Sequence, residues 1–113
     1  MTGRLKDLIK VHGYQVSPEE LEGRLAAHPG VADVAVAGRP DAERGETPVA
    51  WVVRRDVSLA PGALADWLAA RVSHVKRLGR VHFVEAIPRN AAGKIERRRL
   101  VEPGVSADAT TVI

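Results

Sequence analysis

Residues 8–21 read LIKVHGYQVSPEEL, and they predict the first strands and the first helix of the chain. Two short apolar runs flank His12-Gly13, and a glycine between such runs is typical of a hairpin turn because glycine tolerates positive φ. Ser17 follows and can cap a helix, a proline occupies the first helical position, and Glu20 completes a capping box. We therefore expect a two-stranded hairpin that leads directly into an α-helix.

The middle of the chain carries the patterns of three further strands. β-Branched residues dominate residues 31–37 and residues 48–54, which predicts two strands that pair with each other. Between them, residues 38–41 read as a turn and residues 41–47 as a charged, solvated loop. Residues 81–84 predict a third strand.

Helical signals separate and follow these strands. Pro61-Gly62 opens a helix whose apolar residues recur at helical spacing, which predicts a core-facing stripe formed by Leu64, Trp67, Leu68 and Val72. Trp67 on this stripe is expected to be a core residue rather than a ligand contact. Residues 95–100 predict the start of a last helix, and residues 102–113 predict a flexible tail.

These elements predict an α+β fold in which a small sheet of about three strands is flanked by helices and preceded by the hairpin. With 113 residues the chain is long enough for one domain, which we assign to residues 1–101. No internal repeat divides it.

Composition narrows the classes of function. The chain has no cysteine, which excludes disulfides and cysteine metal sites. Its net charge is +3, but the basic residues are spread along the chain and aromatic residues make up only 4% of it, so a base-stacking nucleic-acid surface is not expected. No signal peptide and no membrane span is apparent, and we expect a soluble, cytoplasmic protein.

The sequence lacks the known motifs of catalytic residues. It contains no Gly-x-Ser-x-Gly elbow, and Gly93-Lys94 lacks the other residues of a phosphate-binding P-loop. The histidines have no ligand spacing, so we expect no metal site; they are His12, His28, His74 and His82. The chain therefore does not predict a complete active site.

One polar loop nevertheless has the character of a binding element. Residues 87–98 read IPRNAAGKIERR, with a proline and an Asn-Ala-Ala-Gly run that favour a tight turn. Lys94 follows the glycine and carries a point charge on a long stem, which can reach an anionic group elsewhere. A solvated turn lysine would have the same local sequence.

Two stretches resemble motifs of the adenylate-forming enzymes. Residues 3–22, GRLKDLIKVHGYQVSPEELE, resemble the hinge-and-hairpin motif of that superfamily, and residues 88–98 look like its C-terminal lysine motif. Residues 38–41 and 45–46 fall where the family has a Pro-Asp turn and a Gly-Glu loop. The superfamily comprises acyl- and aryl-CoA synthetases, luciferases and the adenylation domains of nonribosomal peptide synthetases.

The resemblance covers about residues 3–101 and implies the small C-terminal lid domain of such an enzyme. The sequences of residues 5–10 and 15–18 most resemble those of acyl-CoA synthetases of the coumarate-CoA and fatty-acyl-CoA ligase type. In that family an acyl-adenylate forms from ATP and a carboxylic acid, and coenzyme A then converts it to a thioester with release of AMP. ATP, AMP and coenzyme A are thus the implied ligands, with Mg²⁺ held by the large N-terminal domain.

The resemblance also assigns roles to individual residues. Lys94 matches the adenylation lysine, Lys6 matches the hinge, and Gly13 matches the hairpin glycine beside the pantetheine tunnel. Arg4 matches an arginine that contacts the nucleotide ribose. The remaining matches are Lys10 and Gln15, which support use of the acyl-adenylate, and His12, which stands where the family often has a lysine near coenzyme A.

Two alternatives stay open from the sequence. The chain could be a stand-alone small module that binds coenzyme A or a nucleotide, or the small subdomain of a peptide-synthetase adenylation domain. The resemblance favours an excised or truncated ligase domain that requires its N-terminal partner domain and is inactive alone. The acyl substrate cannot be read from these residues.

Overall fold

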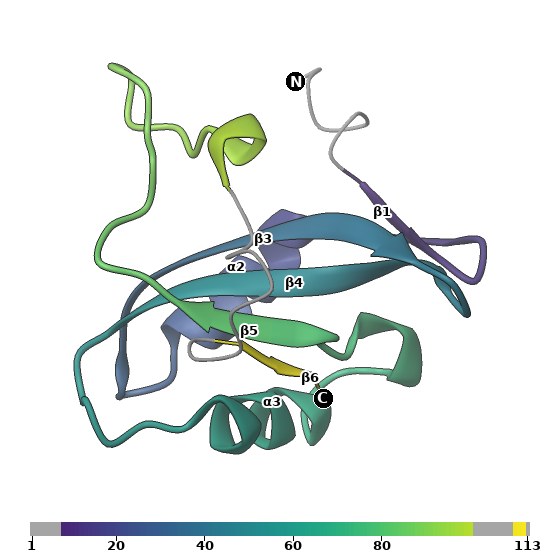
Figure 1. Cartoon of the computed structure of the whole chain (residues 1–113), viewed down its shortest axis with the longest axis horizontal. Helices are drawn as coiled ribbons and strands as arrows, with labels where there is room; N and C mark the ends of the chain where they lie inside the picture. Colours follow the sequence, from purple (N-terminus) through teal and green to yellow (C-terminus); the bar gives the residue numbers. More distant parts are fainter. Residues whose placement is uncertain (1–7, 101–109, 113) are drawn as a thin grey trace.

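A mixed sheet is the centre of the computed structural model, which describes residues 8–100 and 110–112 (Figure 1). Over these residues the sheet has six strands: β1 (Ile9–Val11), β2 (Tyr14–Val16), β3 (Val31–Asp41), β4 (Gly45–Arg54), β5 (Arg80–Phe83) and β6 (Thr110–Val112). The order is β2-β1-β4-β5-β6, and β3 pairs with β4. The predicted α+β class and N-terminal hairpin are confirmed, and β6 is a strand that the sequence did not predict.

The long β3–β4 hairpin corrects the predicted turn. Residues 38–41 continue strand β3 and pair with β4 down to the register Asp41↔Gly45, so only residues 42–44 turn. Pro40 fits because β3 has β4 as its one neighbour in the described sheet, and an edge strand can lack an N–H donor. The Asp41 carboxylate closes the turn by accepting hydrogen bonds from the Glu43 and Arg44 N–H groups at 3.1 and 2.9 Å.

Two helices cover one face of the sheet. Helix α2 (Pro18–Ala26) begins where predicted, because the Ser17 hydroxyl accepts a hydrogen bond from the Glu20 N–H at 3.3 Å. The Glu20 carboxylate, predicted to complete a capping box, binds the Lys76 ammonium instead. Helix α3 (Pro61–Ala69) lies between β4 and β5, which are parallel and therefore need a crossover. Both helices bury leucines against a main core, which includes Ile9, Val36, Val52 and Val81 from the strands.

A second, smaller core lies on the opposite face of the sheet. Successive strand residues point to opposite faces, so Ala35 and Trp51 face away from the helices while Val36 and Ala50 face them. Trp51 is 1% exposed and packs in this second core with Ile87 and Leu100. Trp67 joins the main core as predicted, but it is only partly buried.

The predicted last helix is wrong. Ile95 forms an antiparallel bridge with Arg89, and the only helical structure after it in the described chain is one 3₁₀ turn, η2 (Arg97–Arg99). The Glu96 N–H donates to the Pro88 carbonyl at 2.9 Å, which holds the chain in a loop where an α-helix would begin. Leu100 is extended and ends the turn.

Candidate functional site

The lysine loop, residues 88–96, is closed by its own hydrogen bonds. The Asn90 side-chain oxygen accepts from the N–H groups of Ala92 and Lys94 at 2.9 and 3.0 Å, and the Asn90 N–H donates to the Lys94 carbonyl at 2.9 Å. Gly93 has a φ of +87°, which explains the glycine at this position. The loop therefore fixes the backbone of Lys94 while leaving its side chain exposed.

Arg89 ties this loop to the start of strand β3. Its guanidinium donates to the Gly93 carbonyl at 3.0 Å and to the Asp33 carboxylate at 2.7 Å. Both charged side chains are more than a third exposed, so this ion pair contributes little to stability in water. The pair links the loop to strand β3 at the protein surface.

The hairpin, residues 9–16, presents a cluster of predicted site residues. Lys10 and Gln15 are register partners and both are exposed. His12 and Gly13 form the turn with φ values of +51° and +83°, as in the tight turns whose twist matches that of the strands. A non-glycine residue at positive φ is uncommon and costs about 1 kcal/mol or more, so His12 holds a strained position.

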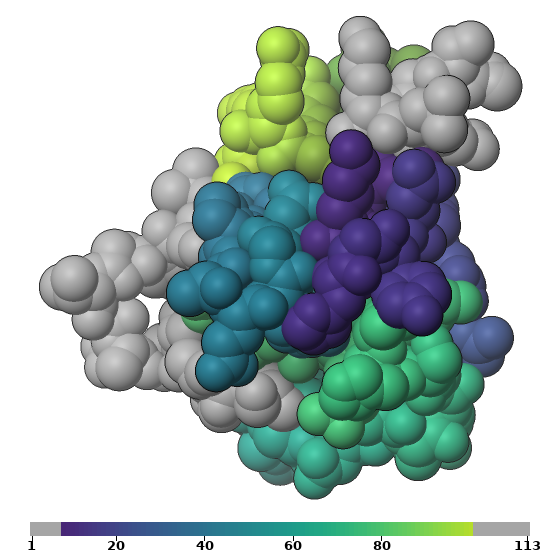
Figure 2. Space-filling model, turned by 90° about the vertical axis from the view of Figure 1, so that its right-hand side faces the viewer, coloured from purple at the N-terminus to yellow at the C-terminus, as the bar shows by residue number. Residues whose placement is uncertain are grey.

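The β3–β4 turn holds the hairpin in place. The His12 N–H donates to the Arg44 carbonyl at 2.8 Å, and the Lys10 N–H donates to the Glu46 carboxylate at 2.8 Å. Strand β1 meets β4 at the pair Val11↔Gly45. Arg44 in the turn and Glu46 at the start of strand β4, both expected to lie in a charged, solvated loop, are therefore structural supports of the hairpin. Figure 2 shows the hairpin on the surface between this turn and the segment around η1 (His74–Lys76).

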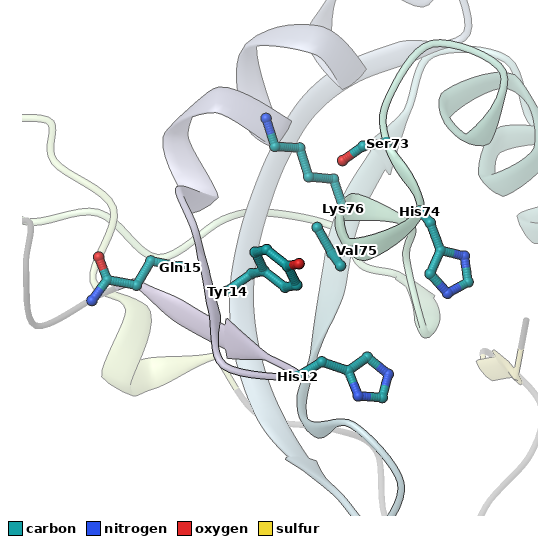
Figure 3. Close-up of a pocket in the computed structure, with 7 residues that line it drawn as sticks. All are labelled: His12, Tyr14, Gln15, Ser73, His74, Val75 and Lys76. Atoms are coloured by element: carbon teal, nitrogen blue, oxygen red, sulfur yellow. The ribbon is translucent and has the colours of Figure 1, made fainter.

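A groove of about 600 Å³ opens beside the hairpin (Figure 3). Its lining comes from two parts of the chain: His12, Tyr14 and Gln15 from the hairpin, and Ser73, His74, Val75 and Lys76 from η1 and its cap. Tyr14 is 63% exposed and its ring lies in the groove, whereas the Gln15 amide points away from it in Figure 3. The η1 residues were not predicted as site residues, because no local pattern links them to a hairpin 60 residues earlier.

The cation in this groove is already paired. The Lys76 ammonium lies 2.8 and 3.0 Å from the two oxygens of Glu20 at the start of helix α2. This hydrogen bond is the main cause that lowers the pKa of Glu20, and Arg24, 3.6 Å away, acts in the same direction. Glu20 therefore anchors η1 to α2 in addition to its place in the first helical turn.

The predicted site residues fall into two separate groups. Lys10, His12, Gly13 and Gln15 lie together on the hairpin, at the right of Figure 1, while the lysine loop lies at the upper left. Arg4 and Lys6 lie outside the described residues. Over the described chain, no group of three potential ligands could hold a metal ion. None of the helices described combines the length and apolar character needed to cross a membrane.

The family model of the AMP-binding enzyme C-terminal domain matches residues 20–94. The chain belongs to this family. Among relatives of the domain, 4-coumarate–CoA ligase-like 5 of Oryza sativa subsp. japonica is 49% identical over 108 residues. Phenylacetyl-CoA ligase epaB of Aspergillus niger is 54% identical over 99 residues. The alignments cover 95% and 86% of this chain and 20% and 18% of the relatives, so the chain spans about a fifth of their length.

Solved structures of similar proteins agree with this assignment. A fatty acyl CoA synthetase of Mycobacterium tuberculosis matches with a TM-score of 0.78 and 39% identity, over 84% of this chain and 19% of the synthetase. The o-succinylbenzoate CoA synthetase of Bacillus subtilis, in complex with an acyl-adenylate intermediate, matches with a TM-score of 0.81 and 32% identity, over 87% of this chain and 20% of the synthetase. The fold and family expected from the two motifs are confirmed.

Proposed function

We propose that this domain is the lid of an acyl-CoA synthetase and works with a large N-terminal domain of the same enzyme. In the first half-reaction, a carboxylate oxygen attacks the α-phosphorus of ATP, and pyrophosphate leaves to give an acyl-adenylate. In the second, the thiol of coenzyme A attacks the acyl carbon, loses its proton, and releases AMP to give the thioester. The domain rotates between the two steps and presents a different surface to each.

The separation of the two groups of site residues carries this proposal. Lys94 projects from a loop whose backbone is fixed, and Gly13 lies in a turn at a distant part of the molecule (Figure 1). A single rigid orientation could not bring both groups to the same reacting atoms. Two orientations of one domain, each serving one half-reaction, account for both groups.

Lys94 serves adenylation in this scheme. Two anions approach each other in this step, and negative charge develops on the α-phosphate oxygens. A fixed ammonium at that point stabilises the transition state more than the separated substrates. The hydrogen bonds of Asn90 support this role because they limit the backbone freedom of Lys94 before any ligand binds.

The hairpin serves thioester formation. Gly13 has open space where a side chain would begin, which would let the thin pantetheine arm of coenzyme A pass. His12, at the edge of the adjacent groove, provides a polar contact for coenzyme A, and Lys10 and Gln15 contact the acyl-adenylate. Arg4 and Lys6 complete the scheme as ribose contact and hinge, and Mg²⁺ belongs to the N-terminal domain.

The 113-residue chain alone is expected to be inactive, because the ATP and acyl pockets belong to the N-terminal domain. An ATP–pyrophosphate exchange assay checks this expectation. Turnover above the buffer background would contradict it. Tight binding of coenzyme A by the isolated chain would favour a stand-alone binding module.

Replacing Gly13 by leucine in the complete enzyme should slow thioester formation much more than adenylation. Gly13→Ala is the matched control, since alanine is also strained at a φ of +83° but adds one methyl group only. We expect the leucine variant to lose about tenfold or more beyond the alanine variant in the coenzyme A step, which corresponds to one obstructed contact in a narrow site. Equal rates for the two variants would place the tunnel elsewhere.

A further inference from the structure

A largely buried ion pair joins three segments of the domain close to the lysine loop. Arg97 donates to both carboxylate oxygens of Glu22 at 2.7 and 2.8 Å. The same carboxylate accepts from the Val36 N–H at 2.8 Å, and Arg97 Nε donates to the Val36 carbonyl at 2.9 Å. These bonds form a closed ring between helix α2, strand β3 and turn η2.

The ring is largely shielded from water, so its hydrogen bonds should be sensitive to substitution of either charged residue. The side chains of Glu22 and Arg97 are 12% and 15% exposed. Burial raises the pKa of Glu22, although Val36 and Arg97 act in the opposite direction. Ionised Glu22 therefore depends on the guanidinium, and removing Arg97 leaves a largely buried carboxylate with the Val36 N–H as its remaining partner in the ring.

The ring is a largely buried polar connection between the body of the domain and the segment that directly follows the lysine loop. The loop closes on itself through Asn90 and through the Glu96 N–H, so these bonds fix its shape but not its position. The Arg89–Asp33 pair does reach the body, but its members are 39% and 38% exposed. Arg97 follows Lys94 by three residues and bonds to strand β3 and helix α2, which pack against each other in the main core.

We infer that Glu22 and Arg97 are positioning residues for the adenylation step: their buried ring sets where the lysine loop stands on the domain and thus where the Lys94 ammonium can reach. The inference rests on the proposed role of Lys94. Neither residue needs to touch a substrate. Their effect should appear in the half-reaction that uses Lys94 and not in the one that uses the hairpin.

The first test compares Arg97→Lys with Arg98→Lys in the complete enzyme. Lysine at 97 keeps a positive charge beside Glu22 but cannot form the whole ring, while Arg98 is exposed and outside it. Arg97→Lys should slow adenylation by about tenfold to hundredfold, as expected for a misplaced catalytic group, and leave thioester formation from supplied acyl-adenylate within about twofold. Glu22→Gln should likewise slow adenylation and spare thioester formation. It replaces Arg97→Lys in this test if that variant folds poorly.

The second test measures hydrogen exchange in the 113-residue chain. In Arg97→Lys, peptides covering residues 88–96 should exchange faster while those covering β4 and β5 stay protected. Equal slowing of both half-reactions, or adenylation as fast as in Arg98→Lys, would overturn the inference. If Lys94→Ala adenylates normally, the proposed function fails, and faster exchange of the loop would still support its attachment through Arg97.

Discussion

Replacing Lys94 by alanine in the complete enzyme is expected to slow adenylation by about 100- to 1,000-fold, the loss seen when one preorganised donor to a developing oxyanion is removed. This corresponds to roughly 3–4 kcal/mol of transition-state stabilisation. Thioester formation from supplied acyl-adenylate should be nearly unchanged, because we propose that the hairpin serves that step. Single-turnover measurements of the two half-reactions check the prediction.

The controls for this experiment follow from the geometry of the loop. The hydrogen bonds that shape it come from the backbone of Lys94 and from Asn90, so Lys94→Ala should leave the loop intact. Lys94→Arg keeps the charge but changes its shape and reach, and should recover only part of the rate. Equal losses in both half-reactions would contradict the division of labour between the lysine loop and the hairpin.

Replacing Trp51 by alanine should destabilise the domain by about 3–5 kcal/mol, the usual cost of removing a buried aromatic side chain. Trp51 is 1% exposed and packs with Ile87 and Leu100, which lie at the two ends of the segment that carries the lysine loop. Arg39 stacks on its ring at 4.9 Å and donates to the Leu100 carbonyl at 2.6 Å. Urea unfolding followed by far-ultraviolet circular dichroism measures the loss.

Trp67→Ala is the matched control on the other face of the sheet. Trp67 is only partly buried, against His28 and under the guanidinium of Arg71, so we expect a smaller loss of about 1–2 kcal/mol. Hydrogen exchange should rise across residues 84–100 in Trp51→Ala and not in Trp67→Ala. Equal losses of stability, or unchanged exchange in that segment, would show that Trp51 does not anchor the lysine loop.

The local sequence determined the turns and the helix cap, which depend on residues only a few positions apart in the chain. The His12-Gly13 turn, the Ser17 cap and the glycine of the lysine loop were all predictable, because positive φ, side-chain capping and tight turns involve residues a few positions apart. The family was also predictable, since its two motifs are each continuous in the sequence. The predicted turn at residues 38–41 was wrong because Gly38 and Pro40, typical turn residues, are accommodated here by an edge strand.

Only the tertiary structure decided how these pieces support one another. The second core around Trp51, the contacts of Arg44 and Glu46 with the hairpin, and the Glu22–Arg97 ring join residues that are distant in the sequence; Glu22 and Arg97 are 75 positions apart. Burial and charge pairing depend on what lies nearby in space, and no local pattern records those neighbours. The sequence therefore proposed Lys94 and Gly13 as site residues, whereas contacts between distant segments determine where the lysine loop and the hairpin lie.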